Sequence, residues 1–175
     1  MTSAIRSRPA APGKLTLFTA AEAPTLEETG MLAAMTFSET HADSTPITEA
    51  ELEKLTTSAR LTVPFRQQGP GGFSLVAIEF APGYMLPRHS HSSDCLYYIL
   101  EGGIVMGRRE LGPGDGFFLP AEQPYAYHAG PQGVKLLEFR NEVAFDMKVY
   151  EKDMAKYRSR ALDSLSAAGT LPAES

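Results

Sequence analysis

The sequence has little cysteine, no block of positive charge and no long apolar run. Its 175 residues include one cysteine, Cys95, so the chain cannot form an intrachain disulfide, which fits a reducing compartment. The formal net charge of -5 argues against nucleic acid or an anionic membrane as a general partner. The N-terminus lacks the apolar block of a signal peptide, and no run approaches the about 20 residues of a membrane span. We therefore expect a cytoplasmic protein with neither kind of partner.

Length and composition fit one domain with extra segments at both ends. The hydrophobic fraction of 43% is ordinary for a globular protein and allows a sizeable core. We expect an N-terminal extension with a short helix over residues 1–61, a β domain over 62–146, and a C-terminal helix and tail over 147–175. Residues 1–14 are polar and rich in proline, and we expect them to be loose.

Many short β-branched and aromatic runs separated by Gly/Pro turns predict an all-β sandwich or barrel. Runs of this kind lie at 73–80, 95–101, 104–106, 117–119, 125–128 and 134–140, with a possible edge strand at 15–18 and a strand or packed arm at 31–37. A tight connection at Gly102 and Gly103 is expected between the second and third of these runs. Helical patterns begin after Thr45 or Thr48 and again at 146–165.

Two histidines one residue apart, His89 and His91, are the strongest candidates for chemistry. Side-chain direction on an extended segment repeats every two residues, so both rings project to the same side. Two imidazoles on one inner face are a common way to hold a transition metal. The alternative is a pair that only forms hydrogen bonds with polar neighbours or with a ligand.

The stretch around these histidines resembles the first motif of the cupin superfamily, which reads Gly, five residues, His-x-His, three or four residues, Glu, six residues, Gly. The matching places are taken by Gly83, His89, His91 and Gly102, and Cys95 stands at the place of the Glu.

A second stretch, residues 111–125, resembles the second motif of the same family, which reads Gly, five residues, Pro-x-Gly, two residues, His. Here Gly114 and Pro120 match, Glu122 replaces the second Gly, and Tyr125 replaces the His. The resemblance covers residues 62–146 and implies a double-sheet jelly roll, also called a double-stranded β-helix. It also implies a divalent transition metal, Fe, Mn, Ni or Zn, which the family usually holds with three His and one Glu.

Several residues could complete such a site. Tyr125 could ligate a metal or orient water or substrate through its hydroxyl, and Tyr97 is expected to face inward beside it, so both are catalytic candidates. His128 faces away from Tyr125 on a regular strand, and a bulge would bring it inside as a ligand. Cys95 is either a small buried hydrophobe or a thiolate ligand. Glu138 is either an inward base or metal ligand, or a rim residue paired with Arg140.

Two functions from different classes follow. The first is a metal-dependent enzyme that acts on a small organic substrate, for example an aromatic or carbonyl compound, and in which His89 and His91 hold the metal with Tyr125 or His128 nearby. A dioxygenase-type reaction is favoured by analogy with relatives, and lyases and isomerases share the architecture. The second is a non-catalytic module that binds or senses a small molecule, which the missing Glu and third His favour. The long leader before residue 62 and the resemblance favour a homodimer.

Overall fold

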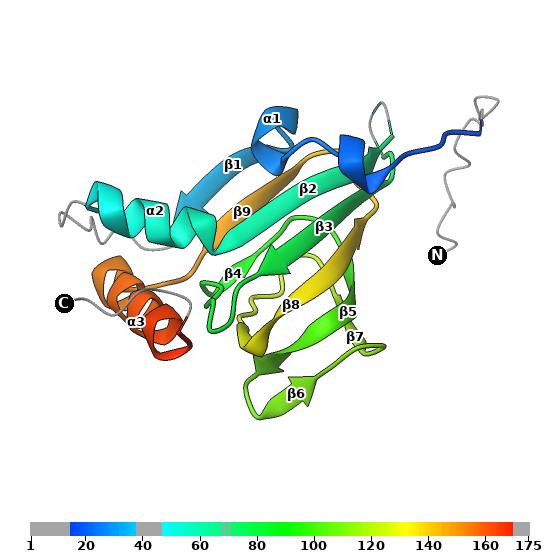
Figure 1. The fold of residues 1–175 in the computed structure, drawn as a ribbon. Coiled ribbons are helices and arrows are strands. Elements are labelled where there is room, and N and C mark those ends of the chain that lie inside the picture. Colours follow the sequence, from blue (N-terminus) through cyan, green and yellow to red (C-terminus); the bar gives the residue numbers. More distant parts are fainter. Residues whose placement is uncertain (1–14, 38–46, 68, 70, 170–175) are drawn as a thin grey trace, which may run out of the picture.

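The computed structural model describes residues 15–37, 47–67, 69 and 71–169 (Figure 1). The expectations for residues 1–14, for Thr45 and for the C-terminal tail from 171 lie outside these ranges.

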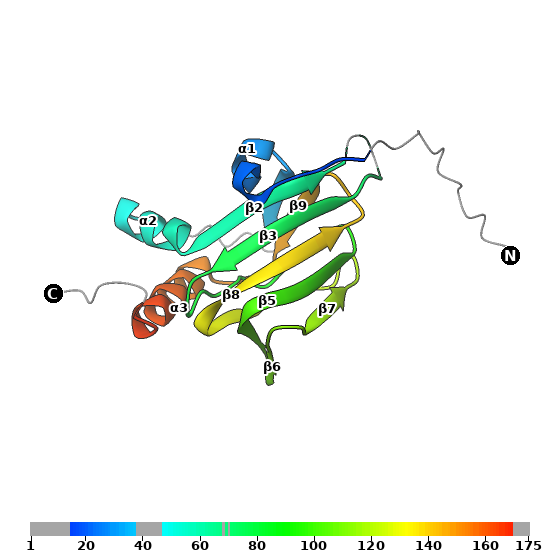
Figure 2. The same cartoon turned by 45° about the vertical axis from the view of Figure 1, so that its right-hand side comes forward.

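Two β-sheets form the body of the described chain (Figures 1 and 2). The smaller sheet has the order β1-β9-β4, with β1 at Leu32–Phe37, β9 at Phe145–Val149 and β4 at His89–Ser90. The larger sheet has the order β2-β3-β8-β5-β6, and β7 also pairs with β5. Its strands are β2 (Ala59–Arg66), β3 (Ser74–Phe80), β5 (Cys95–Met106), β6 (Arg109–Leu111), β7 (Gly116–Leu119) and β8 (His128–Arg140). The predicted all-β fold is confirmed.

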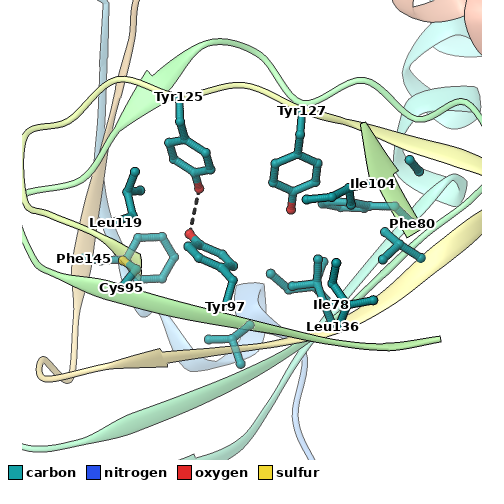
Figure 3. Packing of buried hydrophobic residues seen from close by; sticks show 14 of the residues in the cluster. Ile78, Phe80, Cys95, Tyr97, Ile104, Leu119, Tyr125, Tyr127, Leu136 and Phe145 are labelled. Carbon is teal, nitrogen blue, oxygen red and sulfur yellow. Dashed lines mark hydrogen bonds between the residues drawn. The ribbon is translucent and has the colours of Figure 1, made fainter. Parts of the chain in front are cut away.

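The core lies between the sheets because each strand of the larger sheet buries alternate side chains. On β5, Cys95, Tyr97 and Ile99 are buried, whereas the residues between them are exposed. Figure 3 shows Tyr125 and Tyr127 entering this core from the side opposite to Tyr97. The predicted inward position of Tyr97 is therefore confirmed, and Cys95 and Ile99 share its face of β5.

Helices lie outside the sheets. The 3₁₀ helix η1 spans Ala20–Glu22, α1 spans Leu26–Thr29, α2 spans Glu49–Thr57 and α3 spans Met154–Ala167. Helix α2 begins where the sequence predicts it to begin, because the Thr48 side chain accepts a hydrogen bond from the Glu51 amide and the Glu51 carboxylate accepts one from the Thr48 amide. None of the helices in the described part of the chain is long and apolar enough to cross a membrane.

Three strand predictions are wrong in detail. Residues 125–127 form no strand apart from an isolated bridge between Tyr125 and His89, and β8 begins only at His128. Residues 15–18 form no strand; Phe18 instead packs against Phe65, with ring centroids 5.8 Å apart. The predicted break at Gly102 and Gly103 is a continuation of β5, with a shift in register against β8. Glycine is required at 102, because φ is 66° there and an added Cβ would lie 2.1 Å from the carbonyl oxygen of Gly133.

The predicted C-terminal helix begins later than expected. Residues 145–149 form β9, which pairs in parallel with β1 and antiparallel with β4, and α3 starts only at Met154. Tertiary pairing decides this segment, since Phe145 and Val149 are buried at its two ends. Boundaries drawn at residues 62 and 146 therefore fall inside β2 and β9, and the N-terminal segment supplies a strand, β1, to the smaller sheet.

Candidate metal centre

The histidine pair is fixed by backbone pairing on both sides of β4. His89 and Tyr125 exchange two backbone hydrogen bonds, of 3.0 and 2.9 Å, and His89 also lies opposite Val149 of β9. Both imidazole rings turn inward, with side chains 2% exposed at His89 and 4% exposed at His91. The predicted common orientation of the two rings is what the structure shows.

The Nδ1 atoms of both rings are committed to backbone carbonyls. His89 Nδ1 lies 2.7 Å from the carbonyl oxygen of Pro87, and His91 Nδ1 lies 2.6 Å from that of Asp146. A carbonyl oxygen only accepts hydrogen bonds, so each Nδ1 carries the proton and donates it. Each Nε2 of a neutral ring then presents an unprotonated lone pair. This is the arrangement in which a carbonyl sets the tautomer of a metal-binding histidine.

The two Nε2 atoms face each other at 3.1 Å. Burial lowers the pKa of His89 to about 4 and that of His91 to about 3, and the nearby Arg140 charge lowers both further. Both rings are therefore neutral at neutral pH, and their facing lone pairs cannot form a hydrogen bond with each other. A cation or an additional proton donor is needed to satisfy both.

Two tyrosine hydroxyls lie beside the pair, as expected for Tyr97 and Tyr125. The two hydroxyl oxygens are 2.7 Å apart (Figure 3), and the Tyr125 hydroxyl lies 3.4 Å from His91 Nε2. Burial raises the pKa of both phenols well above the usual value, with a further contribution from the Glu138 charge, so both remain protonated. Tyr125 can donate to His91, but the same proton cannot also satisfy the lone pair of His89.

A buried ion pair lies in the same interior. Glu138 and Arg140 follow one another on the inner face of β8 and are 4% and 2% exposed, and the Arg140 guanidinium donates to the Glu138 carboxylate. The Arg140 guanidinium carbon also lies 3.6 Å from the centroid of the Phe145 ring, and its Nη1 atom is buried without a hydrogen-bond partner. The predicted pairing of the two charges is present, but not at the rim. Sequence parity could have indicated this, since both residues share the phase of the buried Leu136.

The Cys95 thiol behaves as a small buried group in this interior. Burial raises its pKa to about 12, with Glu138 adding to the effect, and its sulfur lies 3.5 Å from the carbonyl oxygen of Ser93. In the absence of a cation the thiolate is therefore not populated at neutral pH.

The structure does not bring His128 to the pair. Tyr125 and Tyr127 are buried, whereas Ala126 and His128 are exposed, so the segment keeps the regular alternation of a strand and has no bulge there that turns His128 inward. His128 pairs with Met85 and Val105 on the outer side of the fold. Among the described residues, no group of three or more His, Cys, Asp and Glu side chains is arranged to hold a metal ion.

Glu122 occupies the left-handed region of backbone conformation, with a φ of 62°. It stands where the second motif has glycine, and its amide donates to the His91 carbonyl oxygen at 2.7 Å. Replacing Glu122 by glycine should raise the free energy of unfolding by about 0.5–1 kcal/mol, because the gain of relieving a left-handed residue exceeds the added freedom of the unfolded chain. Urea unfolding measures this. The control Glu122→Ala keeps the Cβ, and an equal gain from alanine would contradict the explanation.

No family model matches the chain, and no curated protein matches it. Solved structures that are similar to it include KdgF from a Halomonas species, with 20% identity over 49% of this chain and 81% of that chain and a TM-score of 0.43. The polyketide cyclase RemF from Streptomyces resistomycificus has 22% identity over 61% and 84% of the two chains, with a TM-score of 0.49. An RmlC-like cupin from Shewanella frigidimarina has 22% identity over 50% and 78%, with a TM-score of 0.42.

Likeness at this level carries no information about the reaction of this chain. What identifies the architecture is internal to the molecule: the spacing of the first motif, two sheets around one core, and a histidine pair that turns into that core. These features match the double-sheet jelly roll that the resemblance to the cupin motifs implies.

Proposed function

We propose that the chain binds one divalent transition metal through His89 and His91 and uses it on a small organic molecule. The observation that carries the proposal is the pair of unprotonated Nε2 atoms 3.1 Å apart, each in a ring whose Nδ1 donates to a carbonyl. Metal–nitrogen bonds are about 2.0–2.1 Å long, so two nitrogens on one ion lie no more than about 4.2 Å apart. The residues present fit the metal in donor type, tautomer and separation.

A metal held here would supply a Lewis acid, or a centre for oxygen chemistry of the dioxygenase type, at the bottom of the β core. Two protein nitrogens leave most coordination positions to water or to a ligand. The Tyr125 hydroxyl, which lies 3.4 Å from His91 Nε2, would contact a group bound at those positions. As a neutral phenol it would donate a hydrogen bond, and Tyr97 would supply the next donor in the chain at 2.7 Å.

The interior also favours a class of ligand. Aromatic rings surround the tyrosine hydroxyls: Phe117 stacks on Tyr97 at 4.4 Å between centroids and lies 6.1 Å from Tyr125. The unpartnered Arg140 Nη1 is a buried donor in the same core. A flat organic molecule could pack against these aromatic rings, and its carbonyl or carboxylate oxygen would accept a charge-assisted hydrogen bond from the Arg140 guanidinium.

Metal content tests the proposal without requiring a substrate. Protein freed of metal with a chelator and then incubated with Zn²⁺, Mn²⁺, Ni²⁺ or Fe²⁺ under anaerobic conditions should retain about one ion per chain for at least one of them, and should melt at a higher temperature with it. The double variant His89→Ala/His91→Ala should lose both effects. His128→Ala removes an exposed histidine and should keep both. Equal retention by the wild type and the double variant would contradict the proposal.

A non-catalytic sensing module is the second candidate. It is favoured by the deep burial of the pair and by Cys95, a thiol with a raised pKa, at the place of the family's carboxylate. The same experiment separates the two candidates. Absence of bound metal, together with stabilisation by small carbonyl compounds that persists in the double histidine variant, would support the sensing module instead.

A further inference from the structure

The outward face of the larger sheet carries an apolar band that crosses all of its main strands. One row of directly paired residues contains only apolar side chains: Phe65, Leu75, Phe139, Leu96 and Phe118, on β2, β3, β8, β5 and β7 in that order. Paired residues in antiparallel strands project to the same face, so this row is continuous. Leu96 is 49% exposed and Phe118 is 60% exposed.

The next row continues the band towards the middle of the strands. Ala77, Leu137 and Tyr98 pair in register across β3, β8 and β5, and Leu100 follows two residues after Tyr98. Tyr98 and Leu100 are each 46% exposed. In Figure 2 the faces of β3, β8 and β5 are open to the viewer, and no described helix or strand lies across them. The exposed members of the band lie on β5 and β7, and the half-buried Leu75, Leu137 and Phe139 continue it across β3 and β8. An apolar band of this kind marks an interaction surface.

A charged row borders the band, and its signs alternate. Arg60, Glu79, Lys135 and Glu101 pair in register across β2, β3, β8 and β5, which gives the order plus, minus, plus, minus. Neighbours in the row form ion pairs of 3.4 Å between Arg60 and Glu79 and of 2.9 Å between Lys135 and Glu101. All four side chains are between 46% and 66% exposed, so they remain available to a partner.

We propose that this face binds a second copy of the chain, related by a two-fold axis that runs parallel to the strands in the plane of contact. Such a rotation keeps each row at its own level and reverses its order. On these four strands the apolar row then faces its own reverse, so Leu96 faces Phe65 and Leu75 faces Phe139 of the second copy, whereas β7 with Phe118 lies beyond the β2 edge of that copy. The charged row likewise faces its reverse, minus, plus, minus, plus. Arg60 faces Glu101 of the second copy, and Glu79 faces Lys135 of the second copy.

The alternation of charge favours this occupant over others. A partner surface or a membrane of one sign would meet a like charge at every second position of the row, whereas a reversed copy meets an opposite charge at every position. Two sheets packed with aligned strands also match the usual geometry of sheet-on-sheet contacts. The interface lies on the outer face of the sheet, so it does not depend on the proposed metal.

Substitutions within the band test the apolar part of the proposal. The wild-type chain should sediment as a dimer at protein concentrations of about 10–50 µM, because an apolar interface of moderate size usually supports association in this range. Leu96→Asp and Tyr98→Asp should each raise the dimer dissociation constant by about 100-fold or more and give monomers with an unchanged circular dichroism spectrum. Leu52→Asp is the matched control, because Leu52 is 50% exposed on α2, outside the band, and it should remain dimeric.

Charge reversal tests the two-fold axis itself with exposed substitutions that leave the core intact. Glu79→Lys alone and Lys135→Glu alone each place like charges opposite one another in a homodimer, so each should weaken the dimer by about tenfold at low ionic strength. Mixing the two variants restores an opposite charge at every position. Native mass spectrometry of the mixture should show heterodimers as the predominant dimer.

A wild-type chain that sediments as a monomer throughout this concentration range would overturn the proposal. So would a dimer that survives Leu96→Asp and Tyr98→Asp, because it would use another surface. A statistical mixture of homodimers and heterodimers from the charge variants would refute the proposed axis, and metal retention by the monomeric variants would leave the proposed function standing.

Discussion

Replacing Arg140 by methionine should lower the free energy of unfolding by about 3–5 kcal/mol, the usual effect of removing one partner of a buried ion pair. The substitution leaves the buried Glu138 carboxylate without its counter-ion. Glu138 is 4% exposed, and with Arg140 absent its carboxylate has no cation within the core. The substitution also removes the guanidinium from the face of the Phe145 ring, where the separation is 3.6 Å.

The double variant Glu138→Leu/Arg140→Met separates the ion pair from ordinary packing. Since both charges are removed together, no group is left buried without a partner, and the loss should be smaller than that of either single variant. Urea unfolding of the four proteins, wild type, two singles and the double, gives the coupling energy. Losses that simply add would show that the two side chains do not act as a pair.

As the pH falls, the free energy of unfolding of the metal-free chain should decrease more steeply than protonation of its carboxylates alone would cause. In the unfolded chain a histidine has a pKa of about 6.5, whereas burial lowers the pKa to about 4 at His89 and about 3 at His91. The unfolded state therefore binds protons first as the pH falls, and stability is lost below pH 6.5. Two such groups together lower the free energy of unfolding by about 2.7 kcal/mol per pH unit, between pH 6 and about pH 4.5.

The comparison that isolates the pair is the variant His89→Gln/His91→Gln, which keeps polar side chains but cannot titrate. Its free energy of unfolding, measured in urea at half-unit steps from pH 7 to pH 4.5, should fall by about 4–5 kcal/mol less than that of the wild type. His128→Gln serves as the control, because His128 lies on the outer face and should leave the wild-type slope unchanged. Parallel curves for the wild type and the pair variant would contradict the buried neutral state.

Much of the fold follows from the sequence because the strand signals are local. Alternation within 95–101, the Gly/Pro turns and the spacing from Gly83 to Gly102 predict the sheets and the inward histidines, and the structure has them. The helix at 49–57 follows from its Thr48 cap. The failures are at places where distant pairing decides. Residues 145–149 fit a helical pattern in the sequence, but they form a strand because they pair with both β1 and β4. The segment at 15–18 has no strand to pair with in the described chain.

The sequence indicates which residues gather at the candidate site, but not their protonation states. The His-x-His spacing and the resemblance to the second motif predict that His89, His91 and Tyr125 lie together, as they do, whereas His128, also predicted as a ligand, lies outside because the regular alternation is kept. No sequence pattern shows that the carbonyls of Pro87 and Asp146 fix both imidazole tautomers, because the second of these contacts joins residues 55 positions apart. The inward position of Arg140 depends in the same way on the phase that β8 takes against β5.

Anomalous scattering tests the central claim most directly. A crystal of the chain soaked in Zn²⁺, with data collected on both sides of the zinc absorption edge, should show one strong peak in the core, within about 2.0–2.2 Å of the Nε2 atoms of both His89 and His91. A core without anomalous density after the soak, or imidazole rings still facing each other at 3.1 Å with the ion bound elsewhere, would contradict it.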